Sequence, residues 1–285
     1  MKAAAAEAEE GLGAVVVSEG RIATRLFVDQ PLGAGQTVGL DHQQAHFLRA
    51  VLRLQAGAEL ALFNGRDGEW RARIDALGKG WASLAVDAQR REQQPEPDLW
   101  LVFAPIKRAR LDFMVEKACE LGASRLVPVF TQNTDVSRVN CERLRANCRE
   151  AAEQCERLTV PAVDEPTRLR DLLGAWPAER HLLLGAESGD APPVAEELAR
   201  ARERAGGRAG AAAAAAPPVL APWAVLVGPE GGFTEAELDA LTKLPFVTAA
   251  GLGPRVLRAD TAAIALLACW QAWLGDGDAR PPFRT

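Results

Sequence analysis

The segment from Arg21 to about Val86 consists of short apolar runs separated by turn residues. The runs read RLFVD, AELALFN, GEWRARI and WASLAV, with one helical stretch, HQQAHFLRAVL, after the first of them. Asn64-Gly65 and Asp67-Gly68 lie between the second and third runs, and such dipeptides favour the tight turns of β-hairpins. The pattern therefore predicts a small β-barrel-like domain over residues 21–92.

A different pattern begins at Leu99, where apolar runs alternate with segments of helical periodicity. The runs LWLVFA, RLVPVF, HLLLG, AVLVG and FVTAAGL are typical of buried strands. Between or after them lie ARLDFMVEKACELG, a segment whose cysteines are spaced by seven, and ADTAAIALLACWQAWL, each with apolar residues on one predicted helix face. This alternation predicts an α/β fold with a mostly parallel sheet over residues 98–275.

Three segments have a composition that predicts no core structure. Residues 1–20 are dominated by alanine and glutamate, so a disordered leader is expected. QRREQQPEPD, residues 89–98, is polar and contains two prolines, which predicts a linker between the domains. AGGRAGAAAAAAPPVLAP, residues 205–222, is of low complexity and is interpreted as a loop insertion.

Composition narrows the classes of protein to consider. No apolar run approaches the roughly 20 residues of a membrane span, and the acidic start of the chain is unlike a secretory signal. Five cysteines without a C-x-x-C pair indicate neither a disulfide framework nor a zinc cluster, which favours a cytoplasmic protein. His42 and His46 have a metal-compatible spacing but no third ligand nearby, so no metal is predicted.

The charge distribution permits contact with nucleic acid without proving it. The whole chain carries a net charge of −5, which disfavours a protein that only coats nucleic acid. Residues 21–91, however, hold ten basic and seven acidic side chains, a local excess of +3. A basic face on the first domain is compatible with these numbers.

Two glycine-rich turns follow predicted strands and carry the candidate chemistry. They are GPEGGF, residues 228–233, and GLGPRVLR, residues 251–258, and a third strand ends at Leu184-Gly185. In open α/β sheets ligands bind at strand ends, and glycine lets the main chain approach a ligand closely. Neither turn matches a P-loop or a complete dinucleotide fingerprint. The turns therefore predict a nucleoside-like ligand that is not held by phosphates.

The motif VLVGPEGGFTEAEL followed by GLGPRVLRADTAAIAL resembles the RsmE family, the small-subunit rRNA uracil-N3 methyltransferases of the SPOUT superfamily. KRARLDFMVEKACELGASRLVPVF, AEQCERLTVPAV and HFLRAVLRLQAGAELALFNG support the resemblance, which covers residues 21–274. The resemblance implies S-adenosylmethionine as methyl donor and 16S rRNA of the small ribosomal subunit as substrate. It also implies a PUA-like N-terminal domain, a C-terminal SPOUT domain with a trefoil knot, and a homodimer.

The resemblance also assigns the cofactor site residue by residue. The expected cofactor contacts are Leu184, Gly185, Gly228, Pro229, Glu230, Gly231, Gly232, Leu252, Gly253, Pro254, Val256 and Leu257. Uridine N3 carries a proton, so the site must stabilise the developing anion. Arg258 is the first candidate for this catalytic role and Arg255 the second. The family commonly has Arg-Thr-Glu-Thr where this chain has Arg258-Ala259-Asp260-Thr261, and Asp260 is interpreted as a cap of the last helix.

Seven basic residues are expected to contact RNA, with a solvated charged surface as the alternative interpretation. They are Arg25, Arg49, Arg53, Lys107, Arg108, Arg110 and Arg157. Lys107, Arg108 and Arg110 follow a predicted strand end on the same side as the glycine turns, where they could reach phosphates.

Several functions stay open on the sequence alone. Nothing in the turns themselves names uracil N3, so a SPOUT enzyme that acts on another RNA position, transfer RNA included, is one alternative. A non-catalytic RNA-binding protein is the second. A nicotinamide-dependent enzyme is a third and is disfavoured by the broken fingerprint. Trp270 and Trp273 of the last helix are the candidate dimer contacts.

Overall fold

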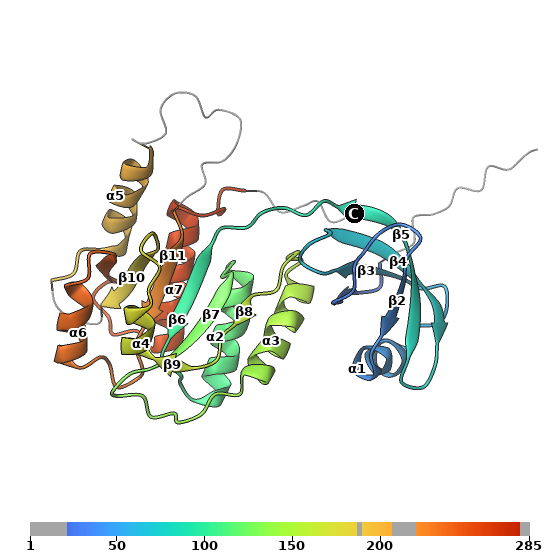
Figure 1. Cartoon of the computed structure of the whole chain (residues 1–285), viewed down its shortest axis with the longest axis horizontal. Helices are drawn as coiled ribbons and strands as arrows, with labels where there is room; N and C mark the ends of the chain where they lie inside the picture. Colours follow the sequence, from blue (N-terminus) through green and yellow to red (C-terminus); the bar gives the residue numbers. More distant parts are fainter. Residues whose placement is uncertain (1–21, 187–189, 207–220, 280–285) are drawn as a thin grey trace, which may run out of the picture.

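A computed structural model describes residues 22–186, 190–206 and 221–279. Within these ranges the chain forms two separate sheets, which are joined by an extended segment that leads into β6 (Figure 1). The predicted leader, residues 1–20, and residues 207–220 of the predicted insertion lie outside the described residues.

The first sheet has five strands in the order β1-β3-β4-β5-β2. Its elements are β1 (Arg25–Phe27), β2 (Thr37–Leu40), α1 (His42–His46), the π-helical turn η1 (Phe47–Val51), β3 (Glu59–Phe63), β4 (Glu69–Leu77) and β5 (Ala82–Arg91). The predicted hairpin between β3 and β4 is confirmed, and the predicted helical stretch forms α1 and η1. Strand β2 was not predicted, because its four residues include a glycine. Strand β5 continues to Arg91, which is beyond the predicted start of the linker.

The second sheet is parallel throughout, and this confirms the predicted α/β class. Its strand order is β12-β10-β11-β6-β7-β8, and β9 also pairs with β7. The strands are β6 (Leu99–Phe103), β7 (Arg125–Phe130), β8 (Ala162–Val163), β9 (Thr167–Arg168), β10 (His181–Ala186), β11 (Trp223–Val227) and β12 (Val247–Gly251). Because all pairings are parallel, the carboxyl ends of these strands lie at one edge of the sheet.

Helices cover both faces of the second sheet. One face packs against α2 (Arg108–Glu120), α3 (Cys141–Gln154), α5 (Val194–Gly206) and α7 (Ala259–Trp273). The other face packs against α4 (Leu169–Gly174) and α6 (Glu235–Thr242). Apolar side chains in each strand alternate between these two cores, as expected for a sheet buried on both sides.

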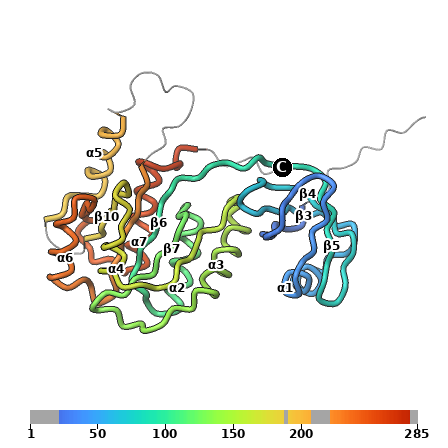
Figure 2. Tube along the Cα trace, in the orientation of Figure 1, coloured from blue at the N-terminus to red at the C-terminus, as the bar shows by residue number. Residues whose placement is uncertain are grey.

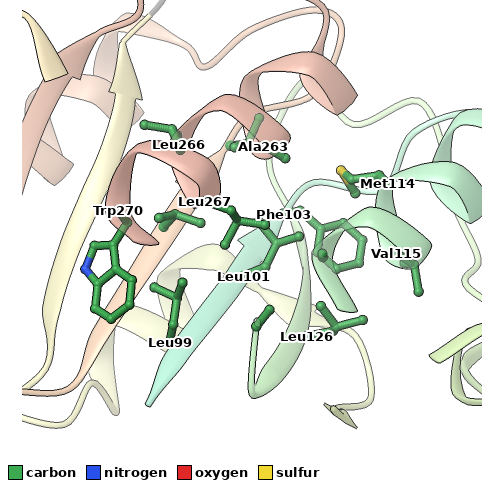
Figure 3. Packing of buried hydrophobic residues seen from close by; sticks show 14 of the residues in the cluster. Leu99, Leu101, Phe103, Met114, Val115, Leu126, Ala263, Leu266, Leu267 and Trp270 are labelled. Carbon is green, nitrogen blue, oxygen red and sulfur yellow. The ribbon is translucent and has the colours of Figure 1, made fainter. Parts of the chain in front are cut away.

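The last helix packs its predicted apolar face on the centre of the sheet. Figure 3 shows Leu267 and Trp270 of α7 close to Leu99 and Leu101 of β6. Trp270 is only 1% exposed, so the expectation that it contacts a second subunit is wrong: the core of the domain uses this side chain. Trp273 lies three residues further along α7 and is 37% exposed.

The cysteines of the third predicted helix are mostly core residues. Cys141 and Cys148 are buried on α3, in the same core as α2 and α7. Cys155 is half-buried and forms the C-terminal cap of α3, beyond the end of the regular helix. The predicted core role is thus confirmed for the two cysteines inside the helix.

Arg25 connects the two sheets instead of facing solvent. Its Nε lies 2.6 Å from the Glu69 carboxylate, and its Nη1 donates to the carbonyl oxygens of Ala152 and Glu153 at the end of α3, at 2.9 and 3.0 Å. Figure 2 shows this end of α3 next to the first sheet. The Arg25 side chain is 9% exposed. Its predicted RNA contact is therefore wrong, because the guanidinium is buried and already hydrogen-bonded.

Arg157 is buried in a similar way. Its Nη1 donates to the carbonyl oxygens of Cys119 and Ala123, and its Nη2 pairs with the carboxylate of Glu96 in the linker. The predicted RNA contact of Arg157 is wrong for the same reason as that of Arg25. The two arginines instead fix the position of the first sheet and the linker relative to α3.

The described residues include neither a helix able to span a membrane nor a cluster able to hold a metal ion. None of the helices within those ranges is both long and apolar enough to cross a membrane. In the same ranges, no cluster of three or more His, Cys, Asp or Glu side chains is arranged to hold a metal ion.

Candidate functional site

The three predicted cofactor segments meet at the carboxyl edge of the second sheet. Strand β10 lies between β11 and β12, with Leu184 opposite Leu226 and Ala186 opposite Gly251. The turns that follow β11 and β12 therefore begin on either side of the end of β10. These segments were predicted to lie at strand ends, and the strand order shows that they are neighbours.

The glycines of the turn after β11 are required by its backbone as well as by any ligand. A Cβ on Gly228 would lie 2.8 Å from the ring of Phe233, closer than real contacts of this kind. Gly232 has φ +68°, which a residue with a Cβ adopts only at a cost. The predicted capping box is confirmed, since Thr234 and Glu237 each accept a hydrogen bond from the other's backbone N–H. The turn is thus held in one shape before α6 begins.

Asn133 supports this turn, and its role was not predicted from the sequence. It lies in the loop 131–140, between β7 and α3, and its Nδ2 donates to the carbonyl oxygens of Gly231 and Gly232, both at 3.1 Å. A Cβ on Gly231 would lie 3.3 Å from the Cβ of Asn133, so the loop and the turn are in close contact. The signal in the sequence was the polar run TQNT directly after RLVPVF, at the edge where the glycine turns also end.

Replacing Asn133 with alanine is expected to weaken binding of S-adenosylmethionine by up to about 30-fold, since two hydrogen bonds each worth about 1 kcal/mol hold the turn. Isothermal titration calorimetry measures this affinity directly. The matched control is Gln132→Ala, because only the backbone N–H of Gln132 contacts α6, at 2.9 Å from Glu237. An equal loss in both variants would show that Asn133 has no special role in holding the turn.

The turn after β12 carries the two predicted catalytic arginines. Gly253 has φ +96°, and Arg255, Val256 and Arg258 are exposed, Val256 to 83%. Neither Arg255 nor Arg258 has an ion pair or side-chain hydrogen bond among the described residues. Arg258 is the N-terminal cap residue of α7, and its side chain makes no capping hydrogen bond. Its guanidinium is therefore available to a substrate at this edge.

Asp260 does not cap α7, contrary to expectation. It is 7% exposed, and its carboxylate accepts a hydrogen bond from Nη1 of Arg110 at 3.0 Å. This ion pair joins the first turn of α7 to the first turn of α2. Arg110, one of the predicted RNA contacts, is consequently anchored to protein, although its side chain stays 38% exposed.

The other predicted RNA contacts lie on the surface. Lys107 and Arg108 are exposed at the start of α2, beside the carboxyl end of β6. Arg49 and Arg53 are exposed on and after η1 of the first sheet. The structure thus separates the predicted set into buried residues at the sheet junction, an anchored Arg110 and four exposed cations.

Comparison with protein families agrees with this architecture. The family described as RNA methyltransferase domain matches residues 92–271, which is more than half of the chain. The family described as RNA methyltransferase PUA domain matches residues 40–84. The first match covers the parallel sheet with its glycine turns, and the second lies within the five-stranded sheet.

Individual proteins are similar over nearly their whole length. The ribosomal RNA small subunit methyltransferase E of Rickettsia conorii is 32% identical over 246 residues, which covers 86% of this chain and 93% of the relative. The protein of the same name from Mycobacterium bovis is 30% identical, with coverage of 86% and 90%. The crystal structure of the Neisseria gonorrhoeae protein of that name, bound to S-adenosyl methionine, is 27% identical with a TM-score of 0.73, and coverage is 89% and 98%. A Legionella pneumophila methyltransferase in complex with the same cofactor is 26% identical, with a TM-score of 0.71 and coverage of 87% and 97%. The chain therefore belongs to the RNA methyltransferase family that contains the ribosomal RNA small subunit methyltransferases E.

Proposed function

We propose that this protein transfers the methyl group of S-adenosylmethionine to N3 of a uridine in 16S rRNA of the small ribosomal subunit. The observation that carries the proposal is the meeting of the three glycine-bearing segments at the ends of β10, β11 and β12. Arg258, which has no ion pair within the described ranges, lies beside them. A ligand at this edge can be contacted by main-chain N–H and C=O groups on three sides.

The proposed cofactor site uses backbone instead of charged side chains. The adenine and ribose of S-adenosylmethionine would be held by Leu184, Gly185, residues 228–232, residues 252–254, Val256 and Leu257. The glycines of both turns fit this role, since a glycine lets a flat ring lie against the main chain. When bound, the cofactor supplies a methyl group on a sulfonium, which is already activated for transfer.

The chain's own part in the reaction is then alignment and charge. Methyl transfer needs the nucleophile, the carbon and the leaving sulfur in line, and positioning alone supplies a large part of the rate. Loss of the N3 proton leaves negative charge on the uracil ring and its oxygens. We assign Arg258 to stabilise that charge, because a cation beside a site of developing charge favours the transition state over the ground state. Arg255, which directly precedes the exposed Val256, is the second candidate.

The remaining parts of the proposal concern partners and assembly. Exposed cations on both sheets, Arg49 and Arg53 on the first and Lys107 and Arg108 on the second, would contact RNA phosphates. We further propose a homodimer that acts in the cytoplasm, where ribosomal subunits are found. Exposed apolar side chains at Val256 and Trp273 support the dimer. The trefoil knot implied by the family resemblance belongs to this proposal as well.

Transfer of labelled methyl groups tests the proposal. Small subunits that lack the modification, large subunits and bulk transfer RNA are each incubated with the protein and methyl-labelled S-adenosylmethionine. Label in small subunits alone is the expected result. Label in transfer RNA or large subunits would move the enzyme to another target. Cofactor binding without any transfer would favour the non-catalytic RNA-binding alternative.

A further inference from the structure

A groove of about 270 Å³ lies between the first turns of α2 and α3 and the loop 131–140. Its apolar lining consists of the buried Ile106 and Leu111 and the partly exposed Val136 and Val139. Three arginines line it as well: Arg108, Arg138 and Arg143. None of the cofactor contacts assigned above belongs to this groove. Its size suits a single base or phosphate group better than a whole cofactor.

The charges around the groove favour an anionic ligand. Arg138 is exposed and has no side-chain partner within the described ranges. Arg108 is 78% exposed, and its Nε is 4.0 Å from the Asp112 carboxylate. Arg143 places its Nε 3.2 Å from the same carboxylate. The charged side chains that line the groove are all arginines, and Asp112, which pairs with two of them, lies beside it.

Asp112 holds the two helical walls of the groove together. Besides the two arginines, its carboxylate accepts a hydrogen bond from Nδ2 of Asn147 on α3, at 3.0 Å. Asn140 caps α3 by accepting from the backbone N–H of Arg143, at 3.1 Å. These contacts fix the groove before any ligand arrives, which reduces the entropy lost on binding.

Two connections place the groove beside the proposed reaction site. The loop 131–140 that lines it also holds the turn after β11, through the bonds of Asn133 to Gly231 and Gly232. Helix α2, which forms one wall, is joined to α7 by the ion pair of Arg110 with Asp260. Asp260 lies two residues after Arg258. The start of α3 and the basic α1–η1 segment also lie on the same side of the two sheets (Figure 1).

We propose that this groove binds one nucleotide of the rRNA substrate next to the target uridine. Arg138 and Arg143 contact its phosphate, as guanidinium groups do through charge-assisted hydrogen bonds. Val136 and Val139, the partly exposed apolar residues of the lining, contact the face of its base, since every base has an apolar face. The inference rests on the proposed function, because the groove lies beyond the ends of β6 and β7, next along the sheet edge to the proposed site at β10 and β11.

Two variants separate charge from shape. Arg138→Ala removes one phosphate contact, and Val136→Trp fills the groove while every charge stays in place. The matched control is Arg170→Ala, since Arg170 is an exposed arginine on α4, on the opposite face of the sheet. Affinity for a small-subunit rRNA fragment is measured at several salt concentrations, together with kcat/KM for methyl transfer and calorimetric affinity for S-adenosylmethionine.

The two variants are expected to differ in salt dependence. Arg138→Ala should bind RNA about tenfold more weakly, with a slope of log affinity against log salt that is smaller by about one. Val136→Trp should bind about tenfold more weakly with an unchanged slope, because a stacked base contributes about 1–3 kcal/mol. Affinity for S-adenosylmethionine and the thermal unfolding midpoint should stay at the wild-type values in both, and Arg170→Ala should behave as wild type.

Wild-type RNA affinity in Val136→Trp would overturn the proposal, as would equal losses in Arg138→Ala and Arg170→Ala. Failure of the proposed function has a different signature. If the wild-type protein transfers no methyl group to small subunits but both groove variants still weaken RNA binding, the groove stands and the reaction assignment falls.

Discussion

Replacing Arg258 with alanine is expected to lower kcat about 100-fold to 1000-fold, the range found when a group that stabilises developing charge is removed. The guanidinium is exposed, unpaired among the described residues and located at the start of α7, beside the ends of β10 and β11. Affinity for S-adenosylmethionine should change less than about twofold, because backbone groups of the turns hold the cofactor. Single-turnover methylation of small subunits and calorimetry measure the two quantities separately.

The positive charge of Arg258 is the property that the next two variants test. Arg258→Lys keeps the positive charge and should recover part of the lost rate, while Arg255→Ala serves as the matched removal of a neighbouring exposed arginine. A loss in cofactor affinity as large as the loss in kcat would make Arg258 a binding residue. A larger loss of kcat in Arg255→Ala than in Arg258→Ala would exchange the two assignments.

Replacing Glu69 with alanine is expected to lower the free energy of unfolding by about 3–5 kcal/mol, as when one partner of a buried ion pair is removed. Glu69 is 2% exposed, and its carboxylate pairs with Arg25 at 2.6 Å, Arg90 at 2.6 Å and Arg91 at 2.7 Å. Two of these arginines also bond to carbonyl oxygens at or just beyond the end of α3. The substitution therefore leaves buried positive charge unpaired at the junction of the sheets.

Urea unfolding measures the loss, and limited proteolysis of the linker, residues 92–98, reports on the junction itself. Glu142→Ala is the control, because Glu142 is 85% exposed and its pair with Arg145 should contribute less than about 1 kcal/mol. If Glu69→Ala is no less stable than this control, the junction does not depend on the ion pairs.

The stability difference should also depend on pH. Burial alone would raise the pKa of the Glu69 carboxyl, but hydrogen bonds and charges of Arg91 and Arg25 outweigh it, and the pKa is lowered. The ordinary value is about 4.3. The contribution of Glu69 is therefore fully present above that pH and is lost as pH falls through the lower folded value. The gap between the wild-type protein and Glu69→Ala should be wide at neutral pH and narrow below about pH 4.

Local patterns were sufficient to predict the elements that build the site. The strands of the second sheet are continuous apolar runs because helices cover both faces, so runs such as LWLVFA and AVLVG stand out. The turns GPEGGF and GLGPRVLR combine glycine with proline directly after such runs, and their positions follow from the chain alone. Strand β2 lacked such a signal because its four residues include a glycine, and helix α4, with six residues, is too short to show a helical period.

Residues whose role depends on a distant partner could not be predicted in this way. Arg25 was assigned to RNA, yet its partners include residues 127 and 128 positions away at the end of α3. Asp260 was assigned to a helix cap, yet it pairs with Arg110, 150 positions away. In a single sequence a basic side chain looks the same whether it faces RNA or a buried carboxylate. Only the strand order and the junction of the two sheets separate the two cases.

Nucleoside mass spectrometry of small ribosomal subunits tests the central claim most directly. Subunits that lack the modification are incubated with S-adenosylmethionine and either the wild-type protein or Arg258→Ala, and their RNA is digested to nucleosides. We predict 3-methyluridine with the wild-type protein and its near absence with the variant. Cofactor binding without 3-methyluridine, or a different methylated nucleoside in its place, would contradict the assignment of uridine N3 as the target.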